Sequence, residues 1–184
     1  MKRRSFLKTA VTLLPAAGLQ EFALAHSSAA PSSAQVHVVG AGLDRFDEVH
    51  SRGFSQILFK VPARETGGGM FIIEHINLVK GGPPLHLHFH QEEWFYVMEG
   101  EVLFQIGGER KHLKAGESVL SPRNVPHAFT TVSEKPGRML IAFTPAGKME
   151  EFFRTTAIPH PPVQDAAFFR RYEMELVGPS PFEG

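Results

Sequence analysis

The stretch PPLHLHFHQEEWFYVMEG concentrates side chains that can bind a metal or move a proton. Three histidines stand on alternate positions and two glutamates follow directly: His86, His88, His90, Glu92 and Glu93. Imidazole nitrogens and carboxylate oxygens are common ligands of divalent transition metals. Alternate side chains of a strand share a face, so His86 and His88 are expected to point to the same side. Strand histidines also occur as ordinary surface or core residues, so this spacing indicates a metal site only when partners come from elsewhere in the chain.

Composition limits the chemistry. The chain has 184 residues, the size of one domain, and 42% of them are hydrophobic, enough for a core. Lys+Arg and Asp+Glu number 19 each, so the net charge is zero, which argues against nucleic acid as a partner. There is no cysteine, so disulfides, thiolate zinc sites and iron–sulfur clusters are excluded and any metal must have N and O ligands.

Short β-rich runs follow one another from Phe54 onward, separated by Gly and Pro: FSQILFKVP, MFIIEHINLV, EWFYVMEG, EVLFQIGGER and later GRMLIAFTP. This punctuation predicts an all-β sandwich or barrel. Helices are expected only near the end, in KMEEFFRTT and in AAFFRRYEMEL, and Asp165 is expected to be the N-cap of the second. These Phe-rich helices are expected on the outside of the barrel. No internal repeat is visible, so the sequence predicts one barrel.

The opening stretch resembles the first motif of the cupins. In that motif a glycine precedes His-x-His, three or four residues separate it from a glutamate, and six more precede a second glycine. His86, His88, Glu93 and Gly100 stand at these positions. Taking Glu92 instead would leave seven residues before the glycine, so the spacing favours Glu93.

The second cupin motif is matched by GESVLSPRNVPH, with Gly116, Pro122 and His127 at the motif spacing. Asn124 stands where the motif has glycine, and asparagine is the residue that best tolerates positive φ after glycine. Thr131 replaces the motif's final asparagine. The resemblance extends over most of the chain and is to small single-domain cupins of the quercetin-dioxygenase-like group.

The resemblance implies a double-stranded β-helix, the jelly-roll barrel of cupins, with short C-terminal helices. It also implies four metal ligands: His86, His88, Glu93 and His127. The cofactor would be one divalent ion of Fe, Mn, Ni, Cu or Zn, because a set of three imidazoles and one carboxylate excludes few of them. As in flavonol-cleaving members, Glu93 would be the catalytic residue, acting as a ligand or as a base.

Other polar residues near the motif have more than one possible position. His90 is expected at the rim of the barrel, and Glu92 is expected in solvent or beside the ligands. Either His75 or Glu74 faces the lumen, because their side chains point to opposite faces. Arg123 and Arg138 would meet an anionic substrate or lie in solvent.

Six strand phenylalanines are expected to pack the core, about half of them pointing inward by alternation: Phe59, Phe71, Phe95, Phe104, Phe129 and Phe143. If some of them line the metal cavity, that cavity would suit a flat or aromatic ligand.

The N-terminus, MKRRSFLKTAVTLLPAAGLQEFALA, has a basic start, a short apolar stretch and a small-x-small end at Ala25. RRSFLK resembles the twin-arginine export signal, which implies a periplasmic protein exported after folding, with no membrane anchor once the signal is cleaved. The expected organisation is a signal peptide, a flexible leader and arm, a cupin barrel, and a C-terminal helical extension, over residues 1–25, 26–50, 51–146 and 147–184.

Three functions fit these features. The first is a metal-dependent dioxygenase acting on a small chelating substrate, such as an enediol, enol or phenol. The second is a cupin that binds or senses a metal or small molecule without catalysis. The third is a non-redox isomerase or lyase. The fold alone does not decide among them. The oligomeric state is open, with a homodimer as one option.

Overall fold

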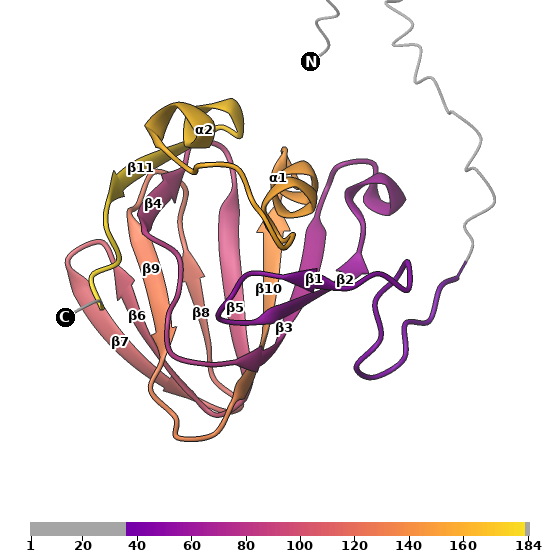
Figure 1. Cartoon of the computed structure of the whole chain (residues 1–184), viewed down its shortest axis with the longest axis horizontal. Helices are drawn as coiled ribbons and strands as arrows, with labels where there is room; N and C mark the ends of the chain where they lie inside the picture. Colours follow the sequence, from indigo (N-terminus) through magenta and orange to yellow (C-terminus); the bar gives the residue numbers. More distant parts are fainter. Residues whose placement is uncertain (1–35, 183–184) are drawn as a thin grey trace, which may run out of the picture. The chain divides into compact units, whose positions relative to one another are not determined.

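The structure, a computed structural model, describes residues 36–182. Their strands form two antiparallel sheets, with the orders β1-β2-β3-β10-β5-β8 and β11-β4-β9-β6-β7 (Figure 1). In chain order the strands are His50–Ser51 (β1), Gln56–Val61 (β2), Phe71–Leu78 (β3), Leu85–His88 (β4), Glu92–Glu99 (β5), Glu101–Ile106 (β6), Glu109–Lys114 (β7), Ser118–Ser121 (β8), His127–Thr131 (β9), Gly137–Thr144 (β10) and Met174–Gly178 (β11). The predicted all-β cupin jelly roll is confirmed.

The helices are a 3-10 turn, Ala63–Thr66 (η1), and two short α-helices, Met149–Thr156 (α1) and Ala166–Arg171 (α2). Figure 1 shows α1 and α2 at the same end of the two sheets. Asp165 is the N-cap of α2, since its carboxylate accepts a hydrogen bond from the Phe168 backbone N–H at 2.8 Å. None of the helices in the described part of the chain has the length and hydrophobicity of a membrane-spanning segment.

The C-terminal segment, expected to be a helical extension, also contains the strand β11. This strand pairs with β4, so that Leu176 lies opposite His86 and Met174 lies opposite His88. The end of the chain therefore fixes the strand that carries the His-x-His pair.

The six strand phenylalanines all lie inside, where about half were expected to. Each is at most 4% exposed. In β5 burial alternates, with Phe95 inside and Trp94 outside, and Phe143 follows the same alternation in β10. Burying these rings removes large apolar areas from water, which favours this parity.

The segment before β1, part of the expected flexible leader, is anchored on the barrel over its described residues. Asp44 is buried, and its carboxylate accepts hydrogen bonds from the backbone N–H groups of Phe46 at 2.7 Å and of Phe59, in β2, at 2.5 Å. The predicted signal peptide lies outside the described residues.

Candidate metal centre

Four side chains from three strands converge inside the barrel. His86 and His88 come from β4, Glu93 from β5 and His127 from β9. Their ligand atoms, one from each residue, all lie within 4.8 Å of one another, and all four residues are buried. The structure thus brings together the four residues that the motif spacing selected.

Strand register and one tight loop produce this convergence. His86 lies directly opposite His127 across β4 and β9, and Glu93 lies opposite Ser121 across β5 and β8. The loop before His127 turns at Asn124, whose φ is 62°, and the Asn124 backbone N–H donates to the His88 carbonyl at 2.7 Å. The second motif is therefore tied by its backbone to the strand of the first.

Hydrogen bonds fix which nitrogen of two imidazoles is free. His86 Nδ1 lies 2.9 Å from the Pro84 carbonyl, and His127 Nδ1 lies 3.0 Å from the Val125 carbonyl and 2.8 Å from Ser121 Oγ. A carbonyl oxygen only accepts, so Nδ1 carries the proton in both rings. Nε2 is then left with its lone pair, the state that a metal ligand requires.

The Glu93 carboxylate lies among these rings. Its Oε2 is 2.7 Å from His127 Nε2 and 3.1 Å from His88 Nε2. Burial alone would raise the pKa of Glu93, but the two imidazoles beside it outweigh burial and hold that pKa well below its usual range. Burial, together with the neighbouring His127 and His88, lowers the pKa of His86 well below its usual value. The site therefore offers an ionised carboxylate and a neutral imidazole at neutral pH.

These residues fit a divalent metal. Oε2 of Glu93 and Nε2 of His127 both present lone pairs at 2.7 Å, a contact that a shared proton or cation must stabilise. Ligand atoms about 2.1 Å from one ion, at right angles to each other, lie about 3 Å apart, which matches the separations from Glu93 to both rings. Both ring nitrogens of His88 are buried, and neither makes a hydrogen bond of good geometry among residues 36–182; Nε2 has the 3.1 Å contact to Glu93, and a metal at Nε2 would satisfy it.

The remaining residues of the opening stretch lie outside this group. His90 is exposed, as expected for the rim. Glu92 forms an ion pair with Arg123 at 2.6 Å, so neither is directed at the four residues. Arg138 pairs with Glu99 at 2.7 Å and with the buried Glu74.

The structure decides between His75 and Glu74. His75 lines the cavity next to the four residues, while Glu74 makes its ion pairs with Arg138 and Lys60 instead. Both side chains are buried, although they point to opposite faces of β3. Strand alternation shows that only one of them can face the lumen, but it does not show which one.

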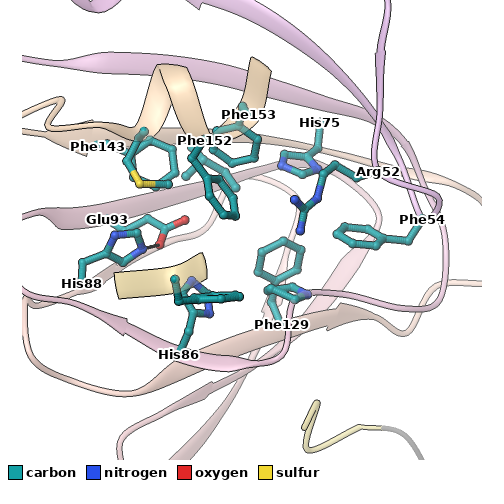
Figure 2. A pocket seen from close by; sticks show the side chains of 14 residues that line it. Arg52, Phe54, His75, His86, His88, Glu93, Phe129, Phe143, Phe152 and Phe153 are labelled. Atoms are coloured by element: carbon teal, nitrogen blue, oxygen red, sulfur yellow. Dashed lines mark ion pairs between the residues drawn. The ribbon is translucent and has the colours of Figure 1, made fainter. Parts of the chain in front are cut away.

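The cavity is lined by His86, His88 and Glu93 at one side (Figure 2). Its walls include six aromatic rings, those of Phe54, Phe129, Phe143, Phe152, Phe153 and Phe169. Three of them belong to the C-terminal helices, so the expectation that α1 and α2 only cover the outside of the barrel is wrong. The apolar faces of the two helices pack against the phenylalanine rings inside the barrel, and this packing makes the helices part of the cavity wall.

Two residues with functional potential were not singled out from the sequence. Ser121 contacts His127 Nδ1, and Arg52 reaches the cavity wall from the loop after β1. Ser121 immediately precedes the second-motif proline, which was a usable signal; Arg52 had none.

A second group of candidate ligands, Asp44, Glu48 and His50, is held together without an ion. The Asp44 carboxylate already accepts three backbone N–H groups, and Glu48 pairs with Arg154 at 2.8 Å. These contacts account for the cluster as an anchor of the N-terminal arm.

Comparison with known proteins supports the same class. Residues 75–143 match the family model described as "Cupin domain", a range that includes all four converging residues. This match and the two-sheet jelly roll support a place for the chain in the cupin superfamily.

Individual relatives cover only parts of the chain or share little identity. An uncharacterized protein, MJ1618, of Methanocaldococcus jannaschii is 28% identical over 67 residues, 36% of this chain and 54% of its own. This chain spans 31% to 54% of the length of the curated relatives that it matches.

Two solved structures resemble the fold. A predicted oxalate decarboxylase of Thermotoga maritima is 16% identical with a TM-score of 0.53, and the alignment covers 59% of this chain and 98% of that one. An RmlC-like cupin of Shewanella frigidimarina is 21% identical with a TM-score of 0.51, covering 64% and 96%. At these identities the likeness shows the fold.

Proposed function

We propose that the protein is a metal-dependent cupin enzyme, dioxygenase-like, that acts on a small chelating substrate such as an enediol, enol or phenol. The observation that carries the proposal is that three of the four converging residues, His86, His88 and Glu93, line one side of a cavity with aromatic walls. A site that only stored a metal would need no space for a second molecule beside it.

His86, His88 and His127 would hold the metal through Nε2, with Glu93 as the fourth ligand. When bound, a divalent ion would supply Lewis-acid chemistry and, for the redox-active ions, electron transfer. The Pro84 and Val125 carbonyls keep two of the rings in the required tautomer and orientation.

Glu93 would also be the group that holds a substrate proton. Its carboxylate is ionised at neutral pH, it lines the cavity, and Oε2 lies within 3.1 Å of Nε2 of both His88 and His127. Because the pKa of Glu93 lies well below its usual range, Glu93 would hold such a proton only in passing and return it to the substrate, while the surrounding phenylalanines limit its loss to water.

Oxygen uptake tests this proposal against its two alternatives. Protein loaded separately with Fe(II), Mn(II), Ni(II), Cu(II) or Zn(II) is incubated with a panel of enediols and phenols while O2 and product are followed. Uptake equal to substrate loss with a redox-active ion, abolished in Glu93→Ala, supports the dioxygenase. Product without uptake would identify an isomerase or lyase instead, and tight binding without turnover would identify a binding or sensing protein.

We also propose that Arg3 and Arg4 direct twin-arginine export to the periplasm, with cleavage after Ala25. The supporting features are the RRSFLK match and the Ala-x-Ala end of the apolar stretch. Replacing both arginines by lysine should leave a longer precursor in the cytoplasm; a mature periplasmic product from that variant would refute the proposal.

A further inference from the structure

A positively charged side chain shares the cavity with the candidate metal ligands. Arg52 follows β1, and its guanidinium lines the cavity beside His75 and Phe54 (Figure 2). Arg52 also lines a neighbouring surface hollow near Gln164. It therefore lies at the boundary between the cavity and the outside, where an incoming ligand would meet it.

No acidic residue of the described chain forms an ion pair with Arg52. Its side-chain contacts are a 3.4 Å hydrogen bond from Nη1 to Gln164 Oε1 and the ring of Phe152, whose centroid lies 5.4 Å from Cζ. Burial lowers the pKa of Arg52 to about 10, whereas hydrogen bonds to Glu74 and Glu99 raise the pKa of Arg138. Arg52 is half-buried, and a cation partly withdrawn from water is destabilised unless it is paired, so a ligand can supply the partner that Arg52 lacks.

A second polar group at the same place is also unsatisfied. His75 is 2% exposed and lines the cavity, and its Nδ1 is bonded to Ser55 Oγ at 2.7 Å. Its Nε2 is buried and has no hydrogen-bond partner in the described part of the protein. Unsatisfied buried nitrogens are rare in folded proteins, and this one lies next to the unpaired guanidinium.

We propose that the substrate is a small aromatic or enolic carboxylate whose carboxylate group binds Arg52, with His75 Nε2 as an additional hydrogen-bond partner. Its chelating oxygens would then face His86, His88 and Glu93 at the other side of the cavity, and its flat body would lie between the phenylalanines. The position of the chelating oxygens rests on the proposed function, whereas the binding of the carboxylate to Arg52 does not.

A carboxylate fits better than a phosphate. One guanidinium matches one negative charge, and its planar fork binds the two carboxylate oxygens together. A phosphate dianion would bring a second charge, and most of the remaining lining is apolar. The cavity supplies no lysine and no second arginine among its lining residues.

Binding of matched ligands tests the inference without turnover. The probes are 3,4-dihydroxybenzoate and its neutral amide, 3,4-dihydroxybenzamide, titrated by calorimetry into full-length protein loaded with redox-inert Zn(II). The proteins are wild type, Arg52→Gln, Arg52→Lys and the control Arg123→Gln, which removes an arginine outside the cavity. Metal content is measured separately for each protein.

Wild type and Arg123→Gln should bind the acid about tenfold to a hundredfold more tightly than the amide, the usual strength of a charge-assisted hydrogen-bonded pair. Arg52→Gln should lose this preference while binding the amide and the metal as wild type does. Arg52→Lys, which keeps the charge, should retain part of the preference. If Arg52→Gln aggregates, Arg52→Lys is compared with wild type instead. A preference for the acid over the amide that is as strong in Arg52→Lys as in wild type would overturn the bidentate contact.

An acid preference that persists in Arg52→Gln, or its absence from wild type, overturns the inference. Failure of the proposed function is distinguished by a metal-free arm with benzoate and benzamide. If the protein holds no metal yet prefers benzoate only when Arg52 is present, the carboxylate site stands and the metal enzyme does not.

Discussion

His75 should make the protein less stable as the pH falls from 7 to 5. Burial, and after it the charge of Arg52, lower the pKa of His75 from 6.5 to about 3. The unfolded chain takes up a proton below pH 6.5 that the folded protein does not accept, so stability present above that pH is lost as the pH falls toward 3. His86 has its pKa lowered too and acts in the same direction.

The size of the effect follows from linkage. A group with a pKa of about 6.5 unfolded and about 3 folded loses about 2 kcal/mol of stabilisation between pH 7 and pH 5, since each pH unit below the unfolded pKa is worth about 1.4 kcal/mol. Glu93 adds nothing in this window, because its lowered pKa costs stability only below its ordinary range near 4.5.

Urea unfolding of metal-free protein at both pH values measures this loss for wild type, His75→Gln and the exposed control His90→Gln. The loss between pH 7 and pH 5 should be about 2 kcal/mol smaller in His75→Gln than in the other two, and the His86 contribution cancels in the comparison. Equal losses in wild type and His75→Gln would show that His75 is not held neutral by burial, and would also weaken its role in the cavity.

Two further substitutions test the supports around the site. Ser121→Ala removes one of two acceptors of His127 Nδ1, so competition with a chelator should show metal affinity reduced about tenfold, the lower end for such supports; unchanged affinity would mean that the Val125 carbonyl orients the ring alone. Asp44→Ala leaves three backbone N–H groups without their acceptor and should lower the free energy of unfolding by about 1–3 kcal/mol, with metal content unchanged; an unaltered unfolding curve would show that the N-terminal arm does not anchor on β2 through this residue.

The ligand group could be selected from the sequence because one pair is local and the other two residues match known motif spacings. His86 and His88 share a face by strand alternation, and the spacings to Glu93 and His127 are those of known motifs. The jelly roll followed from β-rich runs separated by Gly and Pro. These features depend on backbone periodicity, which each segment reveals by itself.

The walls of the cavity depend on contacts between distant segments, which the sequence did not reveal. Arg52 lies more than thirty positions before the ligands, and its side chain contacts Phe152 and Gln164, about a hundred positions later. The pairing of β11 with β4 and the insertion of Phe152 and Phe169 are long-range in the same way. His75 was undecided because Glu74, one position away, finds ion-pair partners on its own side.

Metal content is the most direct test of the site. Elemental analysis after dialysis compares wild type, His127→Ala and His90→Ala, all purified from the native host so that the ion reflects cellular loading. We predict about one divalent ion per chain in wild type and in His90→Ala and almost none in His127→Ala, because the three remaining ligands hold the ion orders of magnitude more weakly. Full metal content in His127→Ala, or its loss in His90→Ala, would contradict the assignment.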